Sequence, residues 1–189
     1  MAEPYECQQI VDDLRRRRPW KRRSVSKIVR VVVHRCDINV ASKGRMGNDP
    51  YSCSAWFAGP DMRWPGHPYH FDVDPMGKVW QTNDLDRLCW GAKFWNAGAL
   101  HIRVEGDFRV VPCPPVQRAA VAMLCCDLLG NLGLGPSAVV GHSELSPHGY
   151  KRCPGDAFEV QELRKLVLMS MAGSVAGVPW RPRHEAWWR

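Results

Sequence analysis

The sequence lacks any long uninterrupted apolar segment. Nowhere does it hold the roughly 18 consecutive apolar residues that a helix needs to cross a bilayer. Its first residues, MAEPYECQQIVDDLRRRRPW, contain no apolar centre of the kind that a secretory signal carries. We therefore expect a chain that is synthesised in the cytoplasm without a signal peptide or a membrane-spanning helix.

The sequence also lacks the motifs of the common nucleic-acid-binding modules. It has no zinc-finger spacing, no aromatic RNA-binding signature and no helix-turn-helix pattern. The net charge of +7 is concentrated near the ends, in residues 15–18, residues 21–23 and three arginines of the last nine residues. Such ends favour an anionic neighbour such as a bacterial envelope surface, although solvated basic arms fit the pattern equally well. We expect no specific nucleic-acid partner.

The length of 189 residues is that of one domain with a full core. We expect a basic N-terminal arm or helix over residues 1–26, one domain over 27–174 and a Trp/Arg-rich tail over 175–189, in a monomer. The eight cysteines lie mostly in apolar surroundings, which favours buried free thiols over disulfides.

Hydrophobic periodicity predicts an α/β domain with a central mixed sheet flanked by helices. Strands are expected at 27–36, 99–108 and 137–143, with a hairpin over 69–81 around the turn DPMG. Helices are expected at 5–18, 114–132 and from 156 to 173, and a helical turn at 51–59.

Two histidines and a cysteine suggest a metal centre. His34 and His142 each end an expected strand, and Cys153 lies on the Gly-, Ser- and Pro-rich loop GHSELSPHGYKRCPG. Imidazole and thiolate ligands suit Zn²⁺, and three protein ligands leave a fourth position for water, as in catalytic sites. From the pattern alone His148, His70 and Cys36 are rival ligands, so the residues indicate a zinc hydrolase and no more.

Several longer motifs resemble one family. The strand ending in His34, then PYHFDVDPMGKVWQTND, WGAKFWNAGALHIRVEGDF and VVGHSELSPHGYKRCPG, occur in the order found in zinc-dependent N-acetylmuramoyl-L-alanine amidases. That family includes phage endolysins, bacterial wall-recycling amidases and animal peptidoglycan-recognition proteins. The resemblance runs from residue 27 to residue 170.

The resemblance implies a Zn²⁺ cofactor held by His34, His142 and Cys153. It also implies hydrolysis of the amide between N-acetylmuramic acid and L-alanine, with peptidoglycan as the partner. Tyr69 and Lys151 fall where family members keep a tyrosine and a lysine beside the zinc, and both side chains suit hydrogen bonding to a tetrahedral oxyanion. Trp90 and Asn96, in the motif WGAKFWNAGALHIRVEGDF, are the expected substrate-binding residues.

The sequence departs from the family pattern at two places. Many members have His-Ala where this chain has Gly91 and Ala92, so an imidazole that contacts substrate is expected to be missing. The stretch SIGIELEG of wall-recycling members reads ALHIRVEG here, with Arg103 at one acidic position and Glu105 at the other. Glu105 is either a general base or the outward residue of a strand.

We expect a phage-type lytic endolysin that acts on the bacterial cell wall after release. An intracellular enzyme that recycles soluble muropeptides is the alternative with the same chemistry. A module that binds peptidoglycan without cutting it is the alternative from another class.

Overall fold

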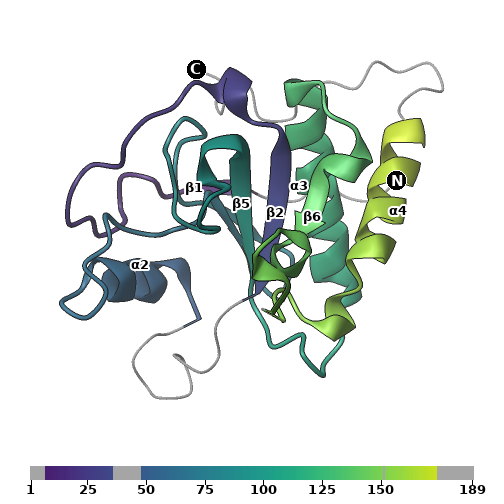
Figure 1. Ribbon diagram of the computed structural model, residues 1–189. Helices are drawn as coiled ribbons and strands as arrows, with labels where there is room; N and C mark the ends of the chain where they lie inside the picture. Colours follow the sequence, from purple (N-terminus) through teal and green to yellow (C-terminus); the bar gives the residue numbers. More distant parts are fainter. Residues whose placement is uncertain (1–6, 36–47, 151, 174–189) are drawn as a thin grey trace.

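The structure, a computed structural model, describes residues 7–35, 48–150 and 152–173 (Figure 1). Its strands are β1 (Cys7–Gln9), β2 (Arg30–Arg35), β3 (Phe71–Val73), β4 (Val79–Gln81), β5 (Ala99–Val104) and β6 (Val139–Gly141). Its α-helices are α2 (Pro50–Ala58), α3 (Pro115–Leu132) and α4 (Val160–Gly173). Short 3-10 turns are η1 (Val25–Lys27), η2 (Asn96–Gly98), η3 (Pro136–Ala138), η4 (His142–Glu144), η5 (His148–Tyr150) and η6 (Asp156–Phe158).

The six strands form one mixed sheet in the order β1-β4-β3-β5-β2-β6. Strands β3, β5, β2 and β6 run parallel to their neighbours in this order, whereas β3 and β4 are the antiparallel arms of the expected hairpin. Strand β1 adds to the far edge, parallel to β4. The sequence-based prediction of an α/β domain with a central mixed sheet is therefore confirmed.

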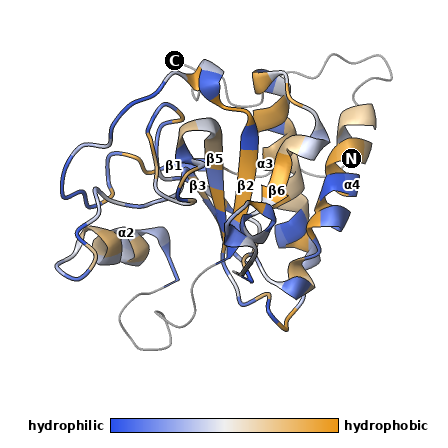
Figure 2. Ribbon diagram, in the orientation of Figure 1, coloured by the Kyte–Doolittle hydropathy of each residue, from blue (hydrophilic) through white to orange (hydrophobic). Residues whose placement is uncertain are grey.

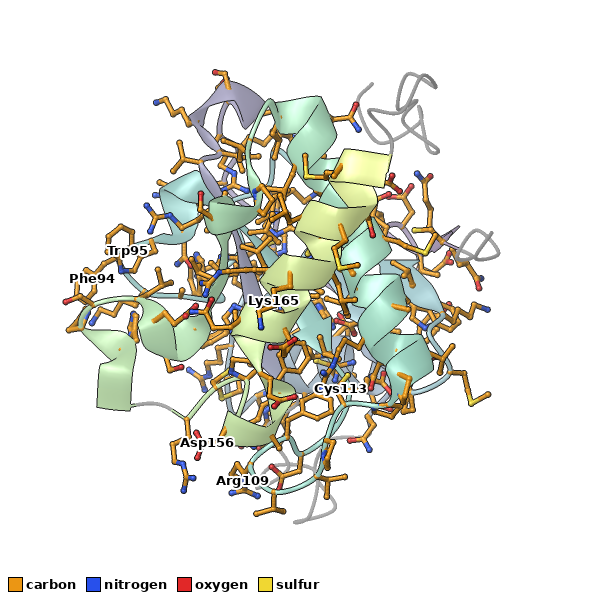
Figure 3. The ribbon with its side chains drawn as sticks, turned by 90° about the vertical axis from the view of Figure 1, so that its right-hand side faces the viewer. Phe94, Trp95, Arg109, Cys113, Asp156 and Lys165 are labelled. Carbon is orange, nitrogen blue, oxygen red and sulfur yellow. The ribbon has the colours of Figure 1, made fainter. Side chains whose placement is uncertain are left out.

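Helices lie on both sides of this sheet. In Figure 1, α3 and α4 lie together at the right of the sheet and α2 lies at the left. Figure 3 views the molecule from the α4 side, with Lys165 near the middle and the Phe94–Trp95 segment at one edge. The two layers differ in helical content. The long helices α3 and α4 lie on one face of the sheet, whereas the short helix α2 and loops lie on the other.

Alternation along the central strands separates a core face from a polar face. Val31 and Val33 of β2, with Leu100 and Ile102 of β5, belong to the buried cluster that includes α3 and α4. Because successive side chains of a strand point to opposite faces, the residues between them point the other way. Figure 2 shows the apolar character of β2 and of the neighbouring edge strand β6.

Helix α3 is positioned by a helical stripe and by one buried amide. Val121, Leu124, Cys125 and Leu128 recur at helical spacing and are all 0% exposed. The side-chain nitrogen of Gln117 donates to two carbonyl oxygens, one at the end of β3 (3.0 Å) and one just past β5 (2.8 Å). These bonds fix the helix against the strand ends that carry the polar face.

Three element predictions need correction. The helix expected over 5–18 is wrong within the described residues, because Cys7–Gln9 pair with β4 and the following segment turns. Helix α4 begins at Val160 and not at Asp156, since Glu159 adopts a left-handed conformation (φ 55°) and Asp156 pairs with Arg152. The turn expected at 51–59 is a nine-residue helix, because Asp49 accepts hydrogen bonds from its first N–H groups.

Some predictions fall outside the described residues, namely those on Lys151, Cys36 and the tail 175–189. Cys53, Cys89, Cys113 and Cys125 are buried free thiols, as expected. None of the helices in the described part of the chain has the length and apolar character needed to span a membrane.

Candidate metal centre and active-site pocket

His34, His142 and Cys153 come together on the polar side of the sheet. One potential ligand atom from each lies within 4.8 Å of those of the other two. It is the one cluster of at least three metal-binding side chains found in the described ranges. His34 and His142 are 1% and 6% exposed, whereas Cys153 is half-buried.

Neighbouring parallel strands bring the two histidines together. Strand β2 pairs with β6 so that Val33 lies opposite Gly141, and each histidine follows directly. Because parallel strands end at the same edge of a sheet, both imidazoles lie at one edge. The sequence-based expectation that His34 and His142 end strands and face the same end of the sheet agrees with this geometry, although β6 is an edge strand and not the central strand that was expected.

The loop that carries Cys153 is tied to the same edge. The backbone N–H of Ser143 donates to the carbonyl oxygen of Cys153 (2.8 Å). Glu144 accepts from the N–H of Gly141 (2.7 Å) and pairs with Arg164 of α4. The indole N–H of Trp95 donates to the carbonyl oxygen of Ser146 (2.6 Å). The hydrogen bond from Ser143 to Cys153 therefore joins the two ends of the loop, and its first residues are tied to α4 and to the Trp95 segment.

The donor set fits a single Zn²⁺ ion. Two imidazoles and one thiol are the ligand types that zinc prefers, and three protein ligands are typical of catalytic sites. The Sγ atom of Cys153 lies 3.8 Å from Nδ1 of His34, and the His34 and His142 rings are 4.7 Å apart. The atoms are thus close enough for one ion to contact all three.

A pocket of about 480 Å³ opens over this cluster. Tyr69 lines it, with its ring 5.0 Å from that of His34, and burial raises the pKa of its phenol well above the ordinary value. The phenol therefore keeps its proton at neutral pH and is available as a hydrogen-bond donor. Five aromatic or apolar side chains form much of the wall, namely Trp56, Phe57, Met62, Trp64 and Trp90.

The charges that line the pocket are positive. Arg35, Arg103 and Arg152 contribute to its lining, and among the described residues no aspartate or glutamate does. Arg35 pairs with Asp107 (3.2 Å), outside the lining. Arg103 pairs with Asp72 and Arg152 pairs with Asp156 in the same way, so the positive charge of the lining is partly compensated by acidic side chains outside it.

A buried polar network underlies the pocket at Arg103. Its guanidinium pairs with Asp72 on the adjacent strand β3, and His67 hydrogen-bonds the same carboxylate (3.0 Å). Burial opposes the charge on Asp72, but Arg103 and His67 together hold its pKa below the ordinary value. This network fixes the arginine in place as part of the pocket.

Glu105 lies at the end of this network. Its carboxylate is 3.3 Å from the Arg103 guanidinium, and burial raises its pKa from 4.5 to about 8, with the negative charge of Asp72 adding to the rise. Within the described part of the chain, Arg103 lines the pocket and Glu105 does not. Glu105 therefore adjoins the pocket through Arg103.

The two expected substrate-binding residues occupy different positions. Trp90 lines the pocket and packs edge-on against Trp20 and Trp64. The side-chain oxygen of Asn96 instead accepts from the backbone N–H of Ala92 (2.8 Å), which closes the loop that carries Trp90. Lys151, the expected oxyanion donor, is outside the described residues.

The rival ligands lie beside the cluster. The His148 ring is 4.8 Å from that of His142, but its Nε2 hydrogen-bonds the carbonyl oxygen of Lys93 (2.8 Å). Nε2 of His70 donates to the carbonyl oxygen of Arg87, and its Nδ1 accepts from the N–H of His101. Neither belongs to the three-residue cluster.

Sequence reasoning did not single out His101 as part of this site. Its Nδ1 lies 3.1 Å from Nε2 of His34, and burial lowers its pKa well below the ordinary value. The predicted alternation of strand 99–108 did place His101 and Arg103 on one polar face. The link to His34 required the β2–β5 register, in which Val32 lies opposite His101.

Comparison with known proteins places this arrangement in a family. The family description N-acetylmuramoyl-L-alanine amidase matches residues 23–156. No curated protein matches the chain by sequence.

Solved structures share the fold at low sequence identity. The endolysin amidase LysCS from Clostridium intestinale URNW has a TM-score of 0.69 and 18% identity, covering 87% of this chain and 97% of that one. The Ph2119 endolysin from a Thermus scotoductus MAT2119 bacteriophage has a TM-score of 0.65 and 20% identity, covering 86% and 99%. A mutant of Drosophila PGRP-LB in complex with tracheal cytotoxin has a TM-score of 0.64 and 14% identity, covering 82% and 91%.

The family match covers most of the described domain and includes the segments that carry His34, His142 and Cys153. The chain therefore belongs to the N-acetylmuramoyl-L-alanine amidase family.

Proposed function

We propose that the chain is a zinc-dependent amidase that hydrolyses the bond between N-acetylmuramic acid and L-alanine in peptidoglycan, in the lytic role of a phage endolysin. The observation that carries the proposal is the cluster of His34, His142 and Cys153 beneath a pocket, in a member of this family. Zinc held there would supply Lewis-acid polarisation of the amide carbonyl.

Tyr69 is proposed to stabilise the charge that develops on the carbonyl oxygen. Its phenol lines the pocket beside His34 and keeps its proton because burial raises its pKa. A donor placed at the oxyanion stabilises the transition state more than the ground state. Lys151 is proposed as a second donor on the strength of the sequence resemblance alone.

Glu105 is proposed as a general base. With a pKa of about 8 its carboxyl group holds a proton through most of the neutral range, and Arg103 lies 3.3 Å away. The group can accept a proton only after it has lost its own. A hydrolysis rate that rises towards pH 8 is therefore the expected signature of this role.

The pocket lining supports an acidic sugar-peptide substrate. Aromatic rings such as Trp64 and Trp90 offer flat apolar surfaces for a sugar, while the guanidinium groups of Arg35 and Arg152 offer hydrogen-bond donors for the carboxylates of a stem peptide. We therefore propose Trp90 as a direct substrate contact. Asn96 is proposed to support substrate binding indirectly, because its hydrogen bond to Ala92 holds the loop that carries Trp90.

The basic N-terminal segment is proposed to contact the anionic envelope next to the substrate. Residues 16–18, Arg22 and Arg87 line a second pocket of about 360 Å³ together with Pro19 and Trp20. Arg18 lies over the ring of Trp90, 5.7 Å from its centre, so the basic pocket adjoins the aromatic wall of the first. An anionic polymer could then contact both at once, which supports peptidoglycan in the wall as the partner.

The amidase domain is proposed to span residues 27–174, with terminal segments over 1–26 and 175–189. The chain is proposed to be a monomer that acts on the bacterial cell wall. The described residues of the first segment already pack on this domain through β1 and the buried side chains of Ile10 and Leu14.

The decisive experiment is a digestion of purified peptidoglycan with zinc-loaded and with chelated protein, followed by mass spectrometry. We expect free stem peptides that begin at L-alanine, and only when metal is present. The Cys153→Ser variant should lose this product together with most of its zinc, whereas Cys113→Ser, a change at a buried thiol that belongs neither to the cluster nor to the pocket lining, should lose neither. Zinc-dependent cleavage of another bond would contradict the proposed specificity.

The same preparation separates the alternatives. A recycling enzyme should prefer soluble muropeptides over whole sacculi, whereas a lytic enzyme should release peptides from sacculi. If zinc is bound but no bond is cut, while the Cys153→Ser variant binds muropeptide as tightly as the wild type, the chain is a binding module and not an enzyme.

A further inference from the structure

His101 lies between the candidate metal centre and the interior of the sheet. It is 0% exposed, and its ring is 5.2 Å from that of His34 on the adjacent strand. Nδ1 of His101 lies 3.1 Å from Nε2 of His34, so the two nitrogens share one hydrogen bond. Of the described residues, none contributes a partner to Nε2 of His101, which is fully enclosed.

The two nitrogens of His34 face different groups. Nδ1 lies 3.8 Å from the sulfur of Cys153, on the side of the three-ligand cluster, while Nε2 faces His101. If a metal takes the lone pair of Nδ1, the neutral ring carries its proton on Nε2. That proton then points at Nδ1 of His101, which must accept it.

The rest of the structure holds His101 in the accepting position. Its backbone N–H donates to Nδ1 of His70 (3.0 Å), and Nε2 of His70 donates to the carbonyl oxygen of Arg87 (3.0 Å). The His70 and His101 rings are stacked, with planes 27° apart. The backbone hydrogen bond to His70 and the stacking of the two rings therefore fix the position of the His101 ring.

Gly91 makes room for this ring on the other side. A Cβ atom at Gly91 would lie 2.6 Å from both Cγ and Nδ1 of His101, closer than any side chain tolerates. The absence of a side chain at Gly91, a departure from the family pattern, is thus matched to the presence of an imidazole at His101.

We propose that His101 is a positioning residue that accepts the Nε2–H of His34 and thereby fixes the tautomer and orientation of this zinc ligand. The proposal rests on the zinc-dependent function proposed above. Histidine ligands in metal sites commonly donate their second N–H to a carboxylate or carbonyl, and loss of that partner typically weakens metal binding about 10–100-fold. Here a neutral imidazole takes that place.

The test compares two variants of nearly equal shape. His101→Asn places an amide oxygen at the position of Nδ1 and can accept the same hydrogen bond, whereas His101→Leu cannot. We expect His101→Leu to bind zinc about 10–100-fold more weakly than the wild type, measured by competition with a chromophoric chelator. His101→Asn should stay within a few-fold of the wild type, and its Co²⁺-loaded form should keep the wild-type visible spectrum.

A double-mutant cycle tests the role of Gly91. Gly91→Ala should weaken zinc binding in the wild type, because the new methyl group displaces the His101 ring. In a His101→Ala background, which has no ring to displace, the same change should have no effect. Circular dichroism and thermal melting establish that each variant is folded.

The outcomes separate this proposal from the proposed function. Equal zinc affinities for wild type, His101→Leu and His101→Asn would overturn the role of His101 and leave the amidase proposal intact. Equal weakening of both variants would also overturn it, because the hydrogen-bond acceptor would then make no difference. A folded wild-type protein that takes up no zinc would refute both proposals together.

Discussion

Replacing Glu105 by glutamine tests the buried network through the pH dependence of stability. The carboxyl group has a pKa of about 8 in the folded chain, against 4.5 ordinarily, mainly because it is buried. In the folded state it therefore keeps a proton that the unfolded chain releases between these values. The contribution of this group to the free energy of unfolding is therefore full below pH 4.5 and decreases as the pH rises towards 8.

The size of the effect follows from the linkage slope. One proton held only by the folded state changes the free energy of unfolding by about 1.36 kcal/mol per pH unit, so the shift from 4.5 to about 8 gives at most about 5 kcal/mol. The side chain retains 10% exposure and lies beside Arg103. We therefore expect about 1–2 kcal/mol to be realised, since water that reaches the partly exposed carboxyl group eases its ionisation.

Glutamine resembles the protonated acid and cannot ionise. We expect the variant to match the wild type at pH 5 and to exceed it by about 1–2 kcal/mol at pH 8. Urea unfolding at pH 5, 6, 7 and 8, followed by tryptophan fluorescence, measures the difference. Glu162→Gln on the exposed side of α4 controls for the loss of one negative charge. Wild-type and Glu105→Gln stabilities that run parallel over this range would refute the reasoning.

Three further predictions concern the pocket, the core and the basic segment. Tyr69→Phe should lower kcat by about 10²–10³-fold with zinc content unchanged, because only the oxyanion donor is removed. Single-turnover digestion of a muropeptide measures this rate, and an unchanged rate would exclude the proposed role of Tyr69. Phe158→Ala should lower the free energy of unfolding by about 3–5 kcal/mol, since Phe158 is 0% exposed and packs on Phe108, and urea unfolding will show whether it does. The double variant Arg17→Ser, Arg18→Ser should bind sacculi more weakly, and its binding should depend less on salt between about 50 and 200 mM, as measured by co-sedimentation. A salt dependence equal to that of the wild type would show that these two arginines do not contact the envelope.

Local patterns in the sequence were sufficient for most of the domain, whereas the choice of His34, His142 and Cys153 over the rival ligands came from the family resemblance. The β-branched run before His34 and the short apolar run before His142 identify strands, and the irregular loop places Cys153 after them. The order of these elements is enough to predict a mixed sheet with sites at the strand ends. Each of these signals is contained in a few adjacent residues.

The errors arose where distant contacts decide the structure. Ile10 and Leu14 have helical spacing, but their buried positions follow from the pairing of residues 7–9 with β4, some seventy positions later. Asp156 is an exception, because it has the chemistry of a helix cap but its carboxylate is taken up by a local ion pair with Arg152, four residues earlier. His101 gained its proposed role only from the register of β2 on β5, which no local periodicity encodes.

The position of β2 has a consequence for how the chain matures. It lies between β5 and β6, and the contact from His34 to Cys153 spans 119 positions. Both edges of this very apolar strand must therefore await partners that leave the ribosome much later. Closing such large loops slows folding, and unpaired apolar edges promote aggregation in the meantime. Production of the protein should therefore be limited by the lifetime of the incomplete sheet, so slower synthesis at lower temperature is expected to raise the soluble yield.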